Sequence, residues 1–419
     1  GYVTALFDLS EIEEELLPYA GILQSVLGII DTEHYGYGEL FNEINVHTGG
    51  IGTSLELYTD VTKVKEKEFR ATFEIKGKAL DPKLDVLFAM MREILMESKL
   101  GDEKRLKEIL SMLKTRLQTS FLSAGHTTAV LRSLSYTSPI ARFRDITSGI
   151  GFYEVVKDLE ENFEERKELL IENLKKIAGR IFRKENLMLS YTSAQEGLAV
   201  LEKAVPQFAD SLHTGEKESH GQCIIHCKKR NEGFRTSSKV QYVARTGNFI
   251  DGGAEYTGAL QILKVILSYD YLWQNVRVKG GAYGCMSGFN RIGEGYLVSY
   301  RDPNLEKTME IYEGVVDYLK NFDIDDRDMN KFIIGTISNL DRPMNPAAKG
   351  SRSLNLYMNR ITEEMIRRER EQILDAQQED IRGLATVLEA VLAAGELCVI
   401  GSEEKIEEAK EMFGEIRTL

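Results

Sequence analysis

The stretch from Arg277 to Gly284 holds the residues whose types and spacing are best suited to chemistry. It reads RVKGGAYG, so a fixed cation, a phenol and three glycines fall within eight residues. A guanidinium offers several N–H donors in a rigid fork and a phenol offers an O–H, while glycines let another backbone approach closely. This combination suits the binding of a peptide in an active site. The structural alternative is a glycine-rich bend into a buried strand, with Tyr283 in the core and Arg277 as a solvated charge.

No metal site or nucleophile can be assembled from the sequence alone. The cluster from Cys223 to Cys227, CIIHC, contains three possible ligands, whereas structural zinc needs four, commonly as two spaced pairs. In a strand the two cysteines would face one side and His226 the other, so we predict a core strand here. His47 precedes Thr-Gly-Gly and is interpreted as a turn residue. The chain has no H-E-x-x-H, H-x-x-E-H, G-x-x-x-x-G-K-[ST] or G-x-S-x-G motif, and we predict no metal ligands in it.

The composition fits a folded protein and excludes several classes of function. Of 419 residues, 42% are hydrophobic and 28% are charged, and the net charge is -13. This acidic balance argues against a nucleic-acid binder, and no apolar run approaches the roughly 20 residues of a membrane helix. Four cysteines are too few for a disulfide scaffold. We therefore expect a cytoplasmic location or another reducing compartment such as an organelle matrix, with no nucleic-acid or membrane partner. The start at Gly1 predicts an excised piece of a longer protein.

An internal duplication organises the elements that position Arg277 to Gly284. LFNEINVHTGGIGTS at 40–54 aligns without a gap to LWQNVRVKGGAYGCM at 272–286, and Asp81-Pro82 matches Asp302-Pro303. At the position of Arg277 the first copy has Asn45, and at that of Tyr283 it has Ile51. The shared fold therefore requires neither the guanidinium nor the phenol, which favours a functional role for both.

The duplication predicts two homologous α+β domains, 1–210 and 211–419, each an antiparallel β-sheet with helices packed on one face. A linker is expected at 207–219, where turn-forming and charged residues interrupt the periodicity. Long helices are expected between the strands, and a last helix is expected to run to the end of the chain. Strands are expected at 2–9, 47–60, 68–80, 186–193, 222–228, 236–245, 282–290, 294–302 and 396–402.

The chain resembles one family of enzymes through three motifs in its second copy. These motifs are RVKGGAYG at 277–284, SYRDPN at 299–304 and DRPMNPAAKG at 341–350. Together with the duplicated α+β pattern they resemble the C-terminal half of presequence proteases, in the pitrilysin and insulinase-like family of zinc metallopeptidases. The resemblance implies an enzyme of four homologous domains in two halves, which closes around an unfolded peptide. It also implies that zinc is bound by an inverted H-x-x-E-H motif in the N-terminal half, so this chain alone should be inactive.

In that family the C-terminal half contributes an arginine and a tyrosine to a composite site, and the matching residues are Arg277 and Tyr283. The resemblance implies that Tyr283 donates to the oxyanion and that Arg277 binds substrate carbonyls, while Gly280, Gly281 and Gly284 let the substrate pass close to the backbone. The expected partners are unfolded peptides and the zinc-bearing half. Two alternatives remain open: a non-catalytic partner subunit of a separate zinc-bearing chain, and a peptide-binding module or scaffold that uses a sheet edge.

Overall fold

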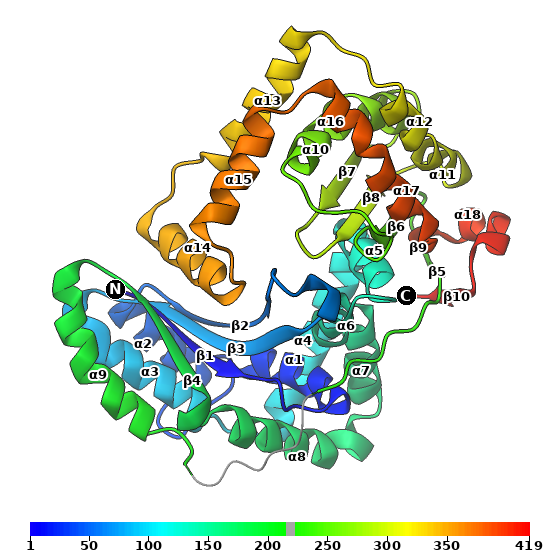
Figure 1. Ribbon diagram of the computed structural model, residues 1–419. Helices are drawn as coiled ribbons and strands as arrows, with labels where there is room; N and C mark the ends of the chain where they lie inside the picture. The colour runs from blue at the N-terminus through cyan, green and yellow to red at the C-terminus, as the bar shows by residue number, and fades with distance from the viewer. Residues whose placement is uncertain (215–222) are drawn as a thin grey trace.

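A computed structural model describes residues 1–214 and 223–419, which form two β-sheets surrounded by helices (Figure 1). The first sheet is antiparallel and has the order β2-β3-β1-β4. The second sheet has the order β10-β5-β9-β6-β8-β7. The strands of the first sheet are β1 (Tyr2–Asp8), β2 (Ile51–Thr59), β3 (Phe69–Lys78) and β4 (Leu187–Thr192). Those of the second are β5 (Glu232–Thr236), β6 (Tyr242–Asn248), β7 (Gly284–Phe289), β8 (Glu294–Tyr300), β9 (Glu396–Ser402) and β10 (Glu415–Thr418).

The helices lie mainly between and around the two sheets. Among the residues that the structure describes, no helix is both long and apolar enough to cross a membrane. The helices before the second sheet are α1 (Leu17–Val26), α2 (Tyr37–His47), α3 (Leu84–Met96), α4 (Glu103–Ser123), α5 (Gly125–Leu134), α6 (Pro139–Ser148), α7 (Ile150–Glu161), α8 (Phe163–Ile181) and α9 (Leu198–Asp210). Those that follow are α10 (Ala259–Tyr269), α11 (Glu306–Glu313), α12 (Val315–Lys320), α13 (Asp326–Leu340), α14 (Pro346–Met358), α15 (Glu363–Leu374), α16 (Gln378–Gly383), α17 (Ala385–Ala393) and α18 (Glu403–Glu408).

The strand order repeats the internal duplication of the sequence. The order β2-β3-β1-β4 becomes β7-β8-β6-β9 when each strand is replaced by its counterpart in the second copy. The aligned segments 40–54 and 272–286 both lead into the edge strand, which is β2 in one sheet and β7 in the other. The segment that contains Arg277 and Tyr283 therefore occupies the same topological place as α2 and the start of β2.

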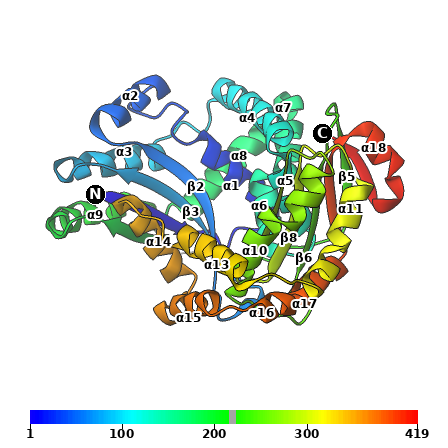
Figure 2. The ribbon, with the colours of Figure 1, turned by 90° about the horizontal axis from the view of Figure 1, so that it is seen from above.

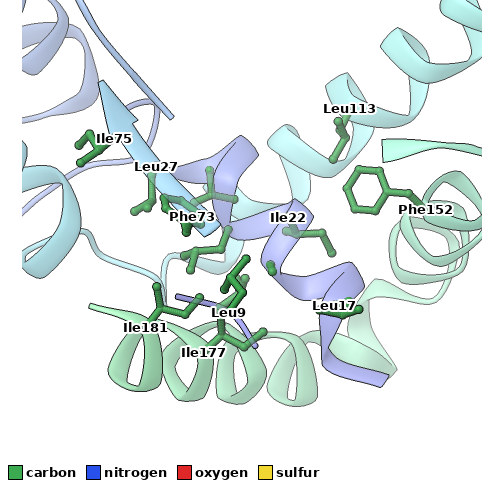
Figure 3. Close-up of a cluster of buried hydrophobic side chains, with 14 of the residues drawn as sticks. Leu9, Leu17, Ile22, Leu27, Phe73, Ile75, Leu113, Phe152, Ile177 and Ile181 are labelled. Carbon is green, nitrogen blue, oxygen red and sulfur yellow. The ribbon is translucent and has the colours of Figure 1, made fainter. Parts of the chain in front are cut away.

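Alternation along the strands of the first sheet creates its core. Phe7 and Phe73 are fully buried and both pack edge to face on Phe182, with ring centroids 5.4 and 5.2 Å apart. Figure 3 shows Phe73 and Ile75 of β3 facing the apolar side chains of α1 and α8. Such burial contributes roughly 1.5–3 kcal/mol for each large side chain, so this core rigidly supports one face of the sheet.

The two halves of the chain exchange helices. α5 packs on β6, β8 and β9 of the second sheet, and α14 packs on β2 and β4 of the first (Figures 1 and 2). A Cβ at Gly350 of α14 would collide with the Thr192 hydroxyl oxygen, so this helix crosses β4 closely. Asn359 then accepts a hydrogen bond from the Thr59 amide at 2.7 Å. Each sheet is thus covered partly by the other half.

Buried charges connect the halves at α5. The Arg132 guanidinium donates to both carboxylate oxygens of Glu232, at 2.6 and 2.9 Å, and to Asp145 at 2.6 Å. Arg132 is 2% exposed, and Asp145 and Glu232 are 0% exposed. Since Arg132 and Asp145 precede the second sheet and Glu232 lies in β5, the network fixes the position of one half against the other. The guanidinium holds the pKa of Glu232 below its ordinary value against the opposing effect of burial.

The α+β class is confirmed, with several local differences from the expected elements. The second sheet is mixed, because β5 pairs parallel with both β9 and β10. It is covered on both faces: Val243 and Val399 belong to the core of α10 and α17, whereas Ala244 and Cys398 join the core that contains α5. The prediction that helices cover one face therefore fails for this sheet, because α5 comes from the other copy.

Local errors concern short elements whose partners are distant in sequence. Residues 223–228 form no strand, although the predicted 222–228 alternates, and residue 222 lies outside the described part of the chain. The strand predicted at 236–245 corresponds to two strands that end and begin at Thr236 and Tyr242. The last helix ends at Glu408, and the four-residue strand β10 follows it. Part of the linker predicted at 207–219 belongs to α9, and 215–219 lie outside the described residues.

Candidate functional site

The backbone from Arg277 to Gly281 forms an unusual turn before β7. Residues Trp273–Val278 are a π-helical turn, whereas the aligned segment of the first copy belongs to the ordinary α-helix α2. The Gly281 amide donates to the Arg277 carbonyl at 2.9 Å, and the Ala282 amide donates to the Val276 carbonyl at 3.1 Å. Short π-helical segments are rare and are found frequently at functional sites. The turn is therefore a local departure from the repeated fold at the predicted site.

Two of the three glycines are required by this turn. Gly281 has a φ of +82°, and a Cβ at Gly280 would collide with the Val276 carbonyl oxygen. A Cβ at Gly284 would meet only ordinary contacts, the nearest being Tyr300 at 3.7 Å. Gly280 and Gly281 thus have a conformational role of their own. The predicted passage of a substrate beside all three glycines stays a prediction.

The Arg277 side chain is stacked and has no carboxylate partner. Its Cζ lies 3.9 Å from the centroid of the Trp273 ring and 5.9 Å from that of Tyr283. Within residues 1–214 and 223–419, no acidic side chain forms an ion pair with this guanidinium. Stacking on an aromatic face orients the guanidinium while its edge remains free to donate hydrogen bonds.

The Tyr283 side chain is 67% exposed, although it begins a strand that is largely buried. Its ring packs edge to face on Tyr300, with centroids 5.7 Å apart, and its amide donates to the Tyr300 carbonyl at 3.1 Å. Its hydroxyl makes no hydrogen bond within the described part of the chain. Tyr283 is therefore not a core residue, and its O–H is available to a ligand.

The motif SYRDPN holds the glycine turn in place. Asn304 Nδ2 donates to the Gly280 carbonyl at 2.6 Å, and the Asn304 amide donates to Asp302 at 2.9 Å. Asp302 is 0% exposed and also accepts from the Thr308 hydroxyl at 2.7 Å. Burial raises the pKa of this carboxyl, and the hydrogen bonds oppose the rise. Sequence reasoning missed this role, because it used the motif only to establish the resemblance.

The first half of the chain supports the site through the junction of α4 and α5. The Tyr300 ring packs edge to face on His126 with centroids 4.9 Å apart, and its hydroxyl donates to the Ser123 carbonyl at 3.4 Å. Burial lowers the pKa of His126, which favours its neutral form. Tyr283 thus rests on Tyr300, which rests on a corner supplied by the other copy.

The residues of the chain do not fit a resident metal ion. In the described ranges there is no group of three or more His, Cys, Asp or Glu side chains that could hold one. His226 Nδ1 lies 2.8 Å from Glu14 in an exposed pair. Burial raises the pKa of Cys223 to about 11 and also raises that of Cys227, so both remain thiols and not the thiolates that bind zinc.

Solved structures with the same fold are peptidases and related chains. The chain matches pitrilysin with a TM-score of 0.60 and 11% identity, over 95% of this chain and 40% of that one. It matches a peptidase M16 inactive domain from Pseudomonas fluorescens with a TM-score of 0.59 and 12% identity, over 95% and 91% of the two chains. These likenesses establish the fold.

Sequence comparisons identify the family. The family model for the domain associated with subfamily C of the M16 peptidases matches residues 1–159, and the model described as "PreP C-terminal domain" matches residues 231–403. The protein HypA of Clostridium perfringens is 37% identical over 420 residues, which are 100% of this chain and 42% of the relative. Presequence protease 1, chloroplastic/mitochondrial, of Arabidopsis thaliana is 29% identical over 410 residues, which are 97% of this chain and 38% of the relative. The chain belongs to the pitrilysin family.

Within the pitrilysin family the chain is presequence protease-like and corresponds to the C-terminal half. It spans about two fifths of the length of the curated relatives that it matches. The resemblance drawn from the three motifs is thereby confirmed, and so is its assignment to the family of peptidases. The roles of Arg277, Tyr283 and the glycines remain predictions about geometry that the structure describes.

Proposed function

We propose that this chain is the non-metal-binding half of a zinc metalloendopeptidase that degrades unfolded peptides in a closed chamber. The observation that carries the proposal is the pairing of an exposed phenol with a stacked guanidinium that has no carboxylate partner among the described residues. Neither feature is required by the repeated fold, as Ile51 and Asn45 in the first copy indicate. A free donor pair at the head of an edge strand suits a peptide whose backbone lies alongside.

The two side chains would act on different parts of the substrate. During peptide hydrolysis negative charge develops on the oxygen of the scissile carbonyl, and a fixed O–H donor at that oxygen stabilises the transition state. Tyr283 is proposed to be this donor, since its hydroxyl is free and its ring is held by Tyr300. Arg277 is proposed to hold neighbouring substrate carbonyls, which its planar fork can bind in a fixed direction.

The remainder of the active site is proposed to belong to a zinc-bearing N-terminal half. The described residues of this chain offer no metal site, so the chain alone is expected to be inactive. Unfolded peptides are the proposed substrates, and a reducing compartment such as the cytoplasm or an organelle matrix is the proposed location. The relatives named presequence protease, mitochondrial, support both proposals.

The test is Tyr283→Phe in the longer protein that contains both halves. Loss of one oxyanion donor typically costs about 2.7–4 kcal/mol, so kcat on an unstructured peptide should fall roughly 100- to 1,000-fold. Tyr37→Phe is a matched control, because Tyr37 is also exposed and lies 3.9 Å from a guanidinium, that of Arg105. Unchanged turnover in Tyr283→Phe would refute the oxyanion role. Equal peptide cleavage by this chain alone and by the longer protein would refute the composite site.

A further inference from the structure

A second arginine, Arg301, adjoins the same pair of tyrosines. Its Cζ lies 5.5 Å from the Tyr300 ring centroid, Tyr300 is 5.7 Å from Tyr283, and Tyr283 is 5.9 Å from the Arg277 guanidinium. The four side chains therefore follow one another in the order Arg277, Tyr283, Tyr300, Arg301. We call this arrangement the Arg–Tyr row. A guanidinium stands at each of its ends.

The backbone of Arg301 adopts a conformation that the fold does not demand. Its φ is +49°, in the left-handed region that residues with a side chain rarely occupy and that concentrates at functional sites. The matching residue of the first copy, which also precedes an Asp-Pro pair, is Leu80, and its φ is -67°. The repeated fold thus forms this corner with ordinary backbone and an uncharged side chain. The left-handed arginine is specific to the copy that carries Arg277 and Tyr283.

The charge of Arg301 is not neutralised within the described part of the chain. The side chain is exposed, and no carboxylate there forms an ion pair with it. It forms a hydrogen bond with the Tyr242 hydroxyl, which itself donates to the Leu122 carbonyl at 2.5 Å. This contact and the Tyr300 ring hold the arginine close to the row, while most of its N–H donors remain free.

We propose that Arg301 binds a carboxylate of the substrate peptide and so makes the protease prefer peptides that carry one near the scissile bond. The inference rests on the proposed function, in which the scissile carbonyl lies at Tyr283. A guanidinium fork matches a carboxylate with two parallel hydrogen bonds. An extended peptide advances roughly 3.3 Å per residue, so the spacings of 5.7 and 5.5 Å from Tyr283 to Arg301 place the carboxylate within about three residues of the cut. It is supplied by an acidic side chain or by the C-terminus of the peptide.

The experiment compares matched peptides in the longer protein that contains both halves. One series places Glu or Gln at each of the three positions on either side of the cleaved bond, and a second series ends in a free acid or an amide. The wild type should cleave the best-placed carboxylate peptide with a kcat/KM roughly tenfold above its neutral match, mainly through KM. Arg301→Gln should bring this ratio close to one and leave the neutral peptide unaffected. Arg301→Lys should keep part of the preference, and higher salt should weaken it.

Arg360→Gln is the matched control, because Arg360 also has a positive φ, of 57°, and lies 5.9 Å from a tyrosine ring. It should keep the preference for a carboxylate. A wild type without any preference, a preference that survives Arg301→Gln, or an equal loss on all peptides would each overturn the role of Arg301. Such results leave the proposed function standing if Tyr283→Phe still slows the cleavage of neutral peptides. If Tyr283→Phe has no effect on these peptides, the proposed function fails instead.

Discussion

Replacing Arg132 with methionine should destabilise the chain more than any exposed charge replacement. The change removes the guanidinium between Glu232 and Asp145, whose side chains are 0% exposed. Breaking a buried ion pair by removing one partner costs about 3–5 kcal/mol, because the remaining charge stays buried without compensation. We expect a loss of about 3 kcal/mol in the free energy of unfolding, near the lower end of this range.

The lower end is expected because other arginines stay near both carboxylates. Arg142 Nη1 lies 3.1 Å from Asp145, while Arg230 and Arg417 lie 3.7 and 3.6 Å from Glu232. These distances allow partial compensation after the guanidinium of Arg132 is removed. The compensation is incomplete, because neither Arg230 nor Arg417 replaces its two short hydrogen bonds to Glu232.

Urea unfolding with two probes provides the assay. Trp273, the one tryptophan, reports on the second half by fluorescence, and far-UV circular dichroism reports on the helices of the whole chain. Because the network joins the halves, both transitions should move to lower urea together. Arg367→Met is the control, since Arg367 pairs with Glu364 and Glu371 on an exposed helix face. A loss in Arg132→Met no larger than in this control would refute the reasoning.

Two further predictions concern the turn and a buried carboxyl. Gly281→Ala should lower the free energy of unfolding by about 1 kcal/mol, because φ is +82° there, whereas Gly284→Ala should change it by less than about 0.5 kcal/mol; thermal unfolding of both variants measures this, and the reverse order would contradict it. Burial raises the pKa of Glu396 above its ordinary 4.5, so the stability that the protonated carboxyl contributes is lost as the pH rises from 4.5 through the raised value. Glu396→Gln should therefore gain stability relative to the wild type over that rise in pH, and parallel pH curves from urea unfolding would exclude this effect.

The sequence predicted the repeated part of the fold well, because its signals are local. Alternation at Tyr2–Asp8 and Glu294–Tyr300 and the gap-free alignment of 40–54 with 272–286 sufficed to locate six of the counterpart strands and the edge position of the site. The same alignment singled out Arg277 and Tyr283, since only the copy lacking them revealed that the fold does not need them. Their proximity, 5.9 Å between guanidinium and ring, agrees with that expectation.

Features that depend on distant pairing escaped prediction. β10 has four residues and exists through its parallel pairing with β5, roughly half the chain away, so its own alternation is too short to reveal it. The alternating residues 223–228 pack beside the first half without a strand partner; the Cys223 amide donates only to the Ser10 carbonyl at 2.7 Å among backbone groups of the described chain. The support of Tyr300 by His126 depends on α5 crossing to the other sheet, which no local pattern records.

The exchange of α5 and α14 between the halves has a consequence for how this duplicated protein can evolve. Residues such as Ala244, Val298 and Cys398 are shielded by a helix encoded in the other copy. A recombination event that transferred one copy by itself would leave this apolar strand face open to water and would remove the support beneath Tyr283. The two copies, once tandem duplicates, are therefore inherited as one unit, and the freedom to diverge is confined to positions such as 277, 283 and 301 that neither copy needs in order to fold.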